Sequence, residues 1–182
     1  QFGIFVAKIF SGDLGTSVLT AHKVTDDIKS VFPATMELAT LGTLIGALIG
    51  IPFGVLAATN QGRWPDQIAR IVGLLGYSIP VFWLGMLGLL VFYAQLGWVD
   101  GPGRLSVEYQ DYIDPITGIM MLDAALQGEW DVFWDAFFHL ILPASMLGLV
   151  CVAYISRMTR SFMINGLQQQ YIISARVKGG PE

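Results

Sequence analysis

Few residues in this sequence have the types and spacing that chemistry requires. The chain contains no G-x-x-x-x-G-K-[ST] phosphate loop, no H-E-x-x-H zinc motif and no G-x-S-x-G nucleophile motif. Cys151 is the single cysteine, so it can form no disulfide within the chain and has no second thiol for a metal site. His139 lies far in sequence from His22, and no cluster of acidic residues or cysteines accompanies it, which favours an interfacial hydrogen-bonding role over metal binding. We therefore expect no catalytic residue, no metal site and no cofactor in this chain, so that any energy source lies in another subunit or in a gradient.

The elements that would position any site are apolar segments of membrane-spanning length. Of the 182 residues, 54% are hydrophobic and 13% are charged, whereas roughly 25% of the residues of a soluble domain are charged. All charged residues lie outside three windows, 38–62, 71–99 and 136–156, and each window supplies the about 20 apolar residues that a bilayer-spanning helix needs. We predict an all-α membrane protein with three spans near 34–59, 71–97 and 137–156.

Ionisable residues inside a bilayer are costly and mark functional sites, and the predicted spans hold almost none. Glu37 lies at the outer edge of the first span and His139 at the outer edge of the third, while the middle of every span is uncharged. A proton- or ion-coupled transporter generally needs a buried carboxylate. The sequence therefore disfavours that class of transporter.

The distribution of basic residues predicts the orientation of the spans. Arginine or lysine residues follow the first span and the third span, whereas the loop 98–136 carries Arg104 alone against eight acidic residues. Basic residues concentrate in cytoplasmic segments, so we expect residues 60–70 and 157–182 to be cytoplasmic and the N-terminal segment and loop 98–136 to be external. The orientation of the spans alone explains a few basic residues beside a membrane. These residues therefore do not support nucleic-acid binding.

Both predicted external segments carry apolar residues at helical spacing. In the segment 1–33 these are Phe2, Phe5, Val6, Ile9 and Phe10, which predict an amphipathic helix on the outer membrane surface. In the loop 98–136 and just beyond it they are Trp130, Phe133, Trp134, Phe137 and Phe138, which are typical of an aromatic belt at a membrane interface. The acidic excess of the loop fits a docking surface for a soluble partner, and a solvated loop would have the same composition.

The predicted spans contain a row of glycines and three prolines. Gly42, Gly46, Gly50 and Gly54 follow one another at intervals of four residues, which favours close packing of the first span against a partner helix. Pro52, Pro80 and Pro143 place one proline in each span, where a kink could gate a pathway. Glycines and prolines are also common in membrane helices that have no such role.

The segment after the third span has the propensity of a short cytoplasmic helix. Ile164, Leu167, Tyr171 and Ala175 share one face, and glycines at 179 and 180 would end the helix. Small residues flanked by cations suit a helix that lies in the cleft of a soluble partner. A tail that only stabilises the membrane-embedded part is the alternative interpretation.

This segment also carries a family resemblance. SARVKG at 174–179 resembles the cytoplasmic EAA loop of binding-protein-dependent ABC importer permeases, with Ala175 at the second alanine and Gly179 at the glycine. Ile173 and Ser174 depart from the glutamate and first alanine, as they do in the peptide-importer branch. Further similarities to that branch follow in the family's order: GDLGTS at 12–17, PATMELA at 33–39, GIPFGV at 50–55, SIPVFWLG at 78–85 and HLILPA at 139–144.

The resemblance implies a permease of a type I ABC importer from the group that takes up dipeptides, oligopeptides, nickel or glutathione. It implies a second similar permease subunit, two cytoplasmic ATPases that hold ATP and magnesium, a solute-binding protein outside, and location in the bacterial inner membrane. By that pattern the chain is an internal fragment with an external segment (1–33) and a transmembrane domain (34–182) that lacks the family's first span and last two. The implied ATPase-coupling residues are Tyr171, Ser174, Ala175, Arg176, Lys178 and Gly179.

The implied mechanism is alternating access, in which the helix around Tyr171 to Gly179 transmits ATPase closure to the spans. Two other functions stay open at this point, a secondary transporter or channel subunit and a noncatalytic membrane scaffold. The sequence does not select one substrate from those of the group.

Overall fold

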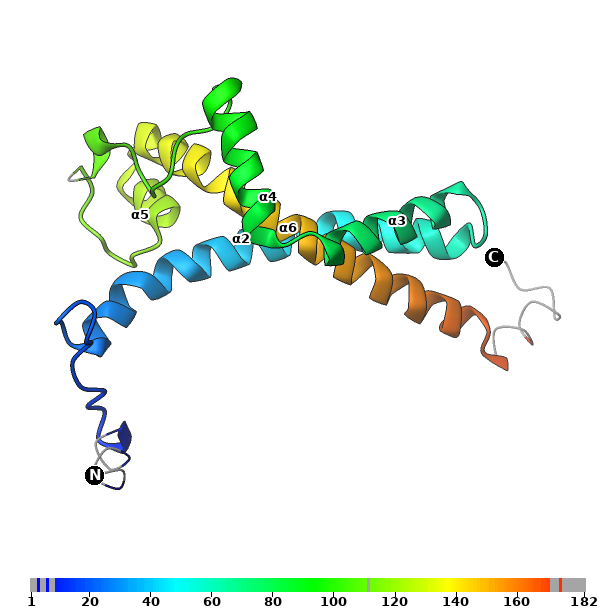
Figure 1. Cartoon of the computed structure of the whole chain (residues 1–182), viewed down its shortest axis with the longest axis horizontal. Helices are drawn as coiled ribbons and strands as arrows, with labels where there is room; N and C mark the ends of the chain where they lie inside the picture. Colours follow the sequence, from blue (N-terminus) through cyan, green and yellow to red (C-terminus); the bar gives the residue numbers. More distant parts are fainter. Residues whose placement is uncertain (1–2, 4–5, 7–8, 111, 171–173, 175–182) are drawn as a thin grey trace. The chain divides into compact units, whose positions relative to one another are not determined.

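The structure, a computed structural model, describes residues 3, 6, 9–110, 112–170 and 174. These residues are mainly helical, with the elements in the order α2, α3, α4, η1, η2, α5 and α6 (Figure 1). Within the described ranges there is no β-strand, and the one β-bridge joins Thr16 to Lys23. The expected all-α class is therefore observed.

Among the described residues, two helices are long and apolar enough to cross a membrane. They are α2 (Val24–Thr59) and α6 (Trp130–Leu167). Large apolar side chains such as Leu48 on α2 and Leu149 on α6 are exposed, as expected of helices whose solvent is lipid. α2 begins ten residues ahead of the predicted span and continues through Pro33, with Asp26 and Asp27 in its first turn, where acidic groups favour a helix start.

The predicted second span is a broken helix. It comprises α3 (Trp64–Ser78) and the helical segment Val81–Gln95, which are bent by 96° relative to each other. The second segment consists of α4 (Val81–Gly88) and the π-helical η1 (Leu89–Gln95). The break falls at Ile79 and Pro80, because a residue before proline is forced out of the α region, and Ile79 has φ −94° and ψ 123°. The described residues thus provide three spans if this bent pair crosses as one.

Helices and loops group into two compact units. The first contains the residues up to Glu37 together with Leu105–Ala136, and the second contains Leu38–Arg104 together with the residues from Phe137 onward. The first unit therefore combines the segment 1–33 with most of the loop 98–136, the two parts that the sequence predicts to be external.

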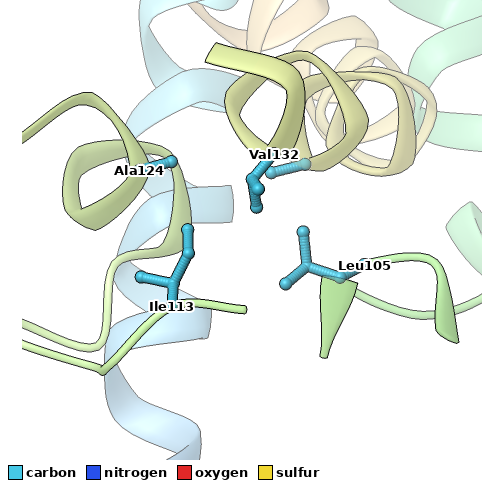
Figure 2. Close-up of a cluster of buried hydrophobic side chains, with 5 residues drawn as sticks. Leu105, Ile113, Ala124 and Val132 are labelled. Carbon is cyan, nitrogen blue, oxygen red and sulfur yellow. The ribbon is translucent and has the colours of Figure 1, made fainter. Parts of the chain in front are cut away.

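A small apolar core holds the first unit together. Leu105, Ile113, Ala124 and Val132 converge on one another in Figure 2, and Ala136 completes the cluster. They come from the loop that contains η2 (Val107–Tyr109), from α5 (Met120–Gln127) and from the start of α6. This core explains how a loop of such length adopts a defined structure.

Asp123 organises the turn that leads into α5. Its carboxylate is fully buried and accepts hydrogen bonds from the backbone amides of Ile116, Thr117 and Gly118 and from the Thr117 hydroxyl, at 2.6 to 3.2 Å. Burial disfavours the charged form, but these four donors outweigh it and hold the pKa of the Asp123 carboxyl below its usual value. Gly118 has φ +79°, which a residue without a side chain adopts freely.

Two further acidic residues join distant parts of the first unit. The Glu37 carboxylate on α2 accepts hydrogen bonds from the backbone amides of Met120 (3.4 Å) and Met121 (2.9 Å) and so caps the N-terminus of α5. Asp135 on α6 accepts bonds from the Ser106 amide (2.8 Å) and hydroxyl (2.6 Å). These bonds fasten the loop to both long helices.

The predicted surface helix of the N-terminal segment is described only in part, because Phe2 and Phe5 lie outside the described residues. Ile9 and Phe10 are helical and exposed. In the predicted aromatic belt, Trp130, Trp134 and Phe138 are exposed, whereas Phe133 packs against the core of the first unit.

Candidate functional site

In the second unit, the four glycines of α2 all face α6. A Cβ atom added at Gly42 would lie 2.8 Å from the Leu147 side chain, and one at Gly50 would lie 3.1 Å from the Ile155 side chain. At Gly46 it would meet the side chain and backbone of Cys151, and at Gly54 it would lie 2.6 Å from the backbone carbonyl of Ser156 and 2.7 Å from Thr159. Glycine therefore permits backbone-to-backbone approach here, as in other membrane helix pairs.

These contacts define the direction of the two helices. Each step of four residues along α2 is matched by a step of four along α6, from Leu147 through Cys151 and Ile155 to Thr159. Residue numbers rise together on both helices, so α2 and α6 are parallel to each other at this contact.

The broken helix contacts α6 in the opposite direction. Gly76 of α3 faces Ala153, and a Cβ atom added at Gly76 would lie 2.5 Å from the Ala153 side chain. Gly88 of α4 faces Leu142, and a Cβ atom added at Gly88 would lie 3.0 Å from the Leu142 side chain. Residue numbers on α6 fall as the chain proceeds through α3 and α4, so this path is antiparallel to α6. Glycine again supplies the close contacts.

An ion pair joins the start of α3 to the last turns of α6. Asp66 is only 1% exposed, and its two carboxylate oxygens accept hydrogen bonds from Arg160 Nε (2.5 Å) and Arg160 Nη2 (3.1 Å), a bidentate geometry. Arg70 Nη2 (3.2 Å) and the Gly62 amide (2.9 Å) donate to the same carboxylate.

Two guanidinium groups share this one carboxylate, so the cluster carries an excess of positive charge. Asp66 precedes the uncharged window 71–99, and the hydrogen bonds from Arg160, Arg70 and Gly62 stabilise its buried carboxylate. Such a cluster suits an anion and disfavours a metal cation.

The sequence predictions do not include this ion pair, because Asp66 lies in the segment 60–70, which was considered only for its basic residues. The signal that could have found it is that Asp66 is the one acidic residue between the first two uncharged windows. An acid so close to a span needs a basic partner, and Arg160 lies at the same boundary after the third window.

The three prolines occupy different settings. Pro80 forms the break between α3 and α4, whereas Pro52 and Pro143 lie inside helices that continue past them. Near Pro143, the Ser145 hydroxyl donates a hydrogen bond to the Leu142 carbonyl (2.7 Å). A gating role for these residues stays a prediction.

A mainly apolar cavity of about 450 Å³ lies beside the Pro80 break. α4 contributes Val81, Phe82 and Gly85, and α6 contributes Leu142, Pro143 and Met146. Its polar edge contains Asp100 and the buried His139, whose Oδ2 and Nδ1 atoms are 3.7 Å apart. His139 therefore lies beside a carboxylate, and its interfacial role stays a prediction.

Most of the predicted coupling segment lies outside the described residues: Tyr171, Ala175, Arg176, Lys178 and Gly179. Ser174 is described, is helical, and donates a hydrogen bond from its hydroxyl to the Gln170 carbonyl (2.8 Å). The role of these residues in coupling stays a prediction.

Comparison with known families decides the classification. The sequence model of the family described as "Binding-protein-dependent transport system inner membrane component" matches residues 50–182, which include the C-terminal end of α2 and all of α3, α4, α5 and α6. The chain belongs to this family. The glycine contacts and the Asp66 ion pair are therefore features of a member of this family of inner-membrane components.

Individual members of the family are similar over nearly the whole chain. The probable D,D-dipeptide transport system permease protein DdpB of Escherichia coli K12 is 43% identical over all of this chain and 53% of its own length. The di/tripeptide permease DppB of Pseudomonas aeruginosa and the dipeptide permease DppB of E. coli K12 are each 40% identical over 98% of this chain. The chain spans about half the length of these curated relatives.

Proposed function

We propose that this chain forms part of the permease subunit of an ATP-driven importer for short peptides. The observation that carries the proposal is membership of the binding-protein-dependent family, together with relatives named as dipeptide and di/tripeptide transport permeases. Long apolar helices with uncharged centres support a pathway lined by neutral groups rather than by a proton relay.

The helix contacts support three crossings of the inner membrane. α2 and α6 are parallel, so the chain between them has to return to the side from which α2 started. The path from Asp66, opposite Arg160, to Gly88, opposite Leu142, follows about 27 Å of α6 at about 1.5 Å per residue. That length is close to the roughly 30 Å of a bilayer core, so the bent pair is long enough to be the returning span.

The orientation that we propose follows the basic residues. Arg63 and Arg70 lie at the α3 end of the bent pair, and Arg157 and Arg160 lie at the corresponding end of α6. Because basic residues concentrate in cytoplasmic segments, we propose that this end is cytoplasmic. The first unit then lies outside, where it would face a solute-binding protein.

We propose that the energy source and the capture of the solute come from partner subunits. We propose a second homologous permease, two cytoplasmic ATPase subunits that bind ATP and magnesium, and an external solute-binding protein. Alternating access requires that ATP and peptide each favour one of two states of the spans. The segment 171–179 would transmit the ATPase motion to α6 because only three residues separate it from the end of that helix at Leu167.

Gly179→Asp tests this proposal in the full-length protein with its partners. We expect peptide uptake and ATPase co-purification to fall by about tenfold or more while membrane insertion stays normal. An unpaired carboxylate in a close protein contact costs several kcal/mol, and about 1.4 kcal/mol already corresponds to a factor of ten. Gln169→Asp is the matched control, because it adds the same charge at an exposed position outside the motif.

Three outcomes would contradict the proposal. Normal coupled uptake in the Gly179→Asp variant would remove the coupling role. Uptake that persists with an inactive ATPase and collapses with the ion gradient would indicate a secondary transporter. A purified complex without any ATPase would indicate a membrane scaffold.

A further inference from the structure

A crevice of about 400 Å³ between α3 and α6 is lined by three arginines, Arg70, Arg157 and Arg160. Arg70 and Arg160 share the carboxylate of Asp66, while the Arg157 guanidinium lies over the Tyr77 ring, 4.8 Å from its centroid. Three cationic groups therefore surround a crevice beside one carboxylate. This charge balance favours an anionic ligand.

The arginines lie where the apolar part of the helices ends. Arg70 directly precedes the uncharged window 71–99, and Arg157 directly follows the window 136–156. At this boundary a bilayer presents its phosphate groups, and basic pockets between membrane helices bind anionic headgroups. Arg70 is 65% exposed, so its guanidinium can reach a ligand while still bonding Asp66.

The deeper part of the crevice is apolar and has unfilled space. Gly73, Leu74 and Tyr77 line it one to two turns further into the uncharged window. Gly73 is buried, yet a Cβ atom added there would have no atom within 4 Å. The missing side chain leaves a recess that could hold a hydrocarbon chain beside the exposed Leu74.

We propose that this crevice binds one anionic phospholipid, with its phosphate between Arg70 and Arg157 and one acyl chain along Gly73 and Leu74. Charge alone would also suit free phosphate, but the apolar recess next to the arginines matches only a ligand that joins an anion to a hydrocarbon chain. The proposal rests on the span placement given under the proposed function and goes beyond it, since transport of peptides does not require a lipid site.

The test uses the full-length protein with its partner subunits in nanodiscs of phosphatidylcholine that contain phosphatidylglycerol. Native mass spectrometry after transfer to mild detergent measures the phosphatidylglycerol that stays bound. We expect Arg157→Gln and Arg70→Gln each to weaken retention about fivefold, since one basic residue near an anionic lipid surface contributes about that factor. Arg63→Gln is the matched control, because Arg63 is exposed but does not line the crevice.

Filling the recess provides a second test that leaves every charge in place. Gly73→Leu places a side chain in open space, so we expect the helices to pack as before and phosphatidylglycerol retention to fall to the level of the Arg157→Gln variant. Unchanged retention in Gly73→Leu would overturn the placement of the acyl chain.

Other results would overturn the lipid assignment itself. They are equal retention in Arg157→Gln and Arg63→Gln, equal retention of phosphatidylcholine and phosphatidylglycerol, and displacement of the lipid by millimolar inorganic phosphate. A photoreactive group at Leu74 that links to an ATPase subunit instead of lipid would show a protein occupant. Because binding is measured without uptake, failure of peptide transport in the parent protein would leave this test intact.

Discussion

Asp66 is the residue on which the junction of α3 and α6 depends. Its carboxylate is buried and receives donors from Arg160, Arg70 and Gly62, and these come from three different places in the chain. The partners differ in exposure, 20% for Arg160 and 65% for Arg70. An exposed ion pair contributes about 1 kcal/mol or less, whereas loss of one member of a buried pair costs roughly 3 to 5 kcal/mol.

We predict that Asp66→Asn and Arg160→Gln destabilise the full-length protein strongly and that Arg70→Gln does not. The expected loss is about 3 kcal/mol for the first two variants and about 1 kcal/mol or less for the third. Thermal loss of the monodisperse peak in size-exclusion chromatography measures the ranking. Equal destabilisation by Arg70→Gln and Arg160→Gln would show that the bidentate bond is not the dominant one.

At the scale of single residues, the sequence singled out ionisable groups of the long helices without identifying their partners. Glu37 and His139 were expected at the edges of the spans. The structure adds that Glu37 caps α5 and that His139 lies beside Asp100. Those partners are 83 to 84 residues away for Glu37, and no local pattern encodes such a pairing.

At the scale of helices, the row of glycines on α2 matters because it meets atoms of different rigidity on α6. Gly46 faces the backbone of Cys151, and Gly54 faces the carbonyl oxygen of Ser156, neither of which can move without displacing α6. Gly42 faces only side-chain atoms of Leu147, of which the Cγ and Cδ2 atoms can move with a change of rotamer while the Cβ atom, at 3.1 Å, cannot. The four positions are therefore not equivalent.

We predict that Gly46→Ala and Gly54→Ala each cost about 1 to 3 kcal/mol of stability through overpacking, and that Gly42→Ala costs less. Thermal unfolding of the full-length protein in mild detergent measures this ranking. Gly166→Ala is the matched control, because Gly166 is helical and an added Cβ would have no neighbour within 4 Å. Equal tolerance at Gly46 and Gly166 would show that the α2–α6 contact is looser than described.

Periodicity identified helical segments well but not their continuity. The apolar windows located α2 and α6, and the spacing of four glycines indicated a packing face without identifying α6 as the partner. The pattern did not show the 96° bend in the predicted second span, although Pro80 was its only sequence signal. A proline permits a kink or a complete break, and tertiary packing decides between them.

At the scale of the whole molecule, the direction of the helices limits the topology. Parallel α2 and α6 with an antiparallel path between them fit three crossings, and the orientation that we propose for these crossings rests on the basic residues. Composition and hydropathy were sufficient for the class of protein, because the bilayer leaves few structures available to an apolar chain. The residues that would pair with the ATPases lie mostly outside the described part.

We predict that residues 61 and 168 lie on the cytoplasmic side and residue 107 on the outer side. Single cysteines introduced by Gln61→Cys, Val107→Cys and Gln168→Cys into a Cys151→Ser background can be labelled with an impermeant maleimide. We expect the variant at 107 to react in intact cells and the other two only after permeabilisation. Labelling of the variant at 168 in intact cells would reverse the proposed orientation.

The matched spacing of contacts on α2 and α6 also limits how the pair can move. Each glycine accepts atoms of one or two residues of α6, and the next equivalent arrangement lies four residues away, about 6 Å along the axis at about 1.5 Å per residue. Intermediate offsets would bring side chains of α2 against the α6 backbone. We therefore expect the two helices to move together as one rigid body or to shift by a whole repeat of these contacts. Gradual sliding of one helix along the other would bring the side chains and backbones into collision.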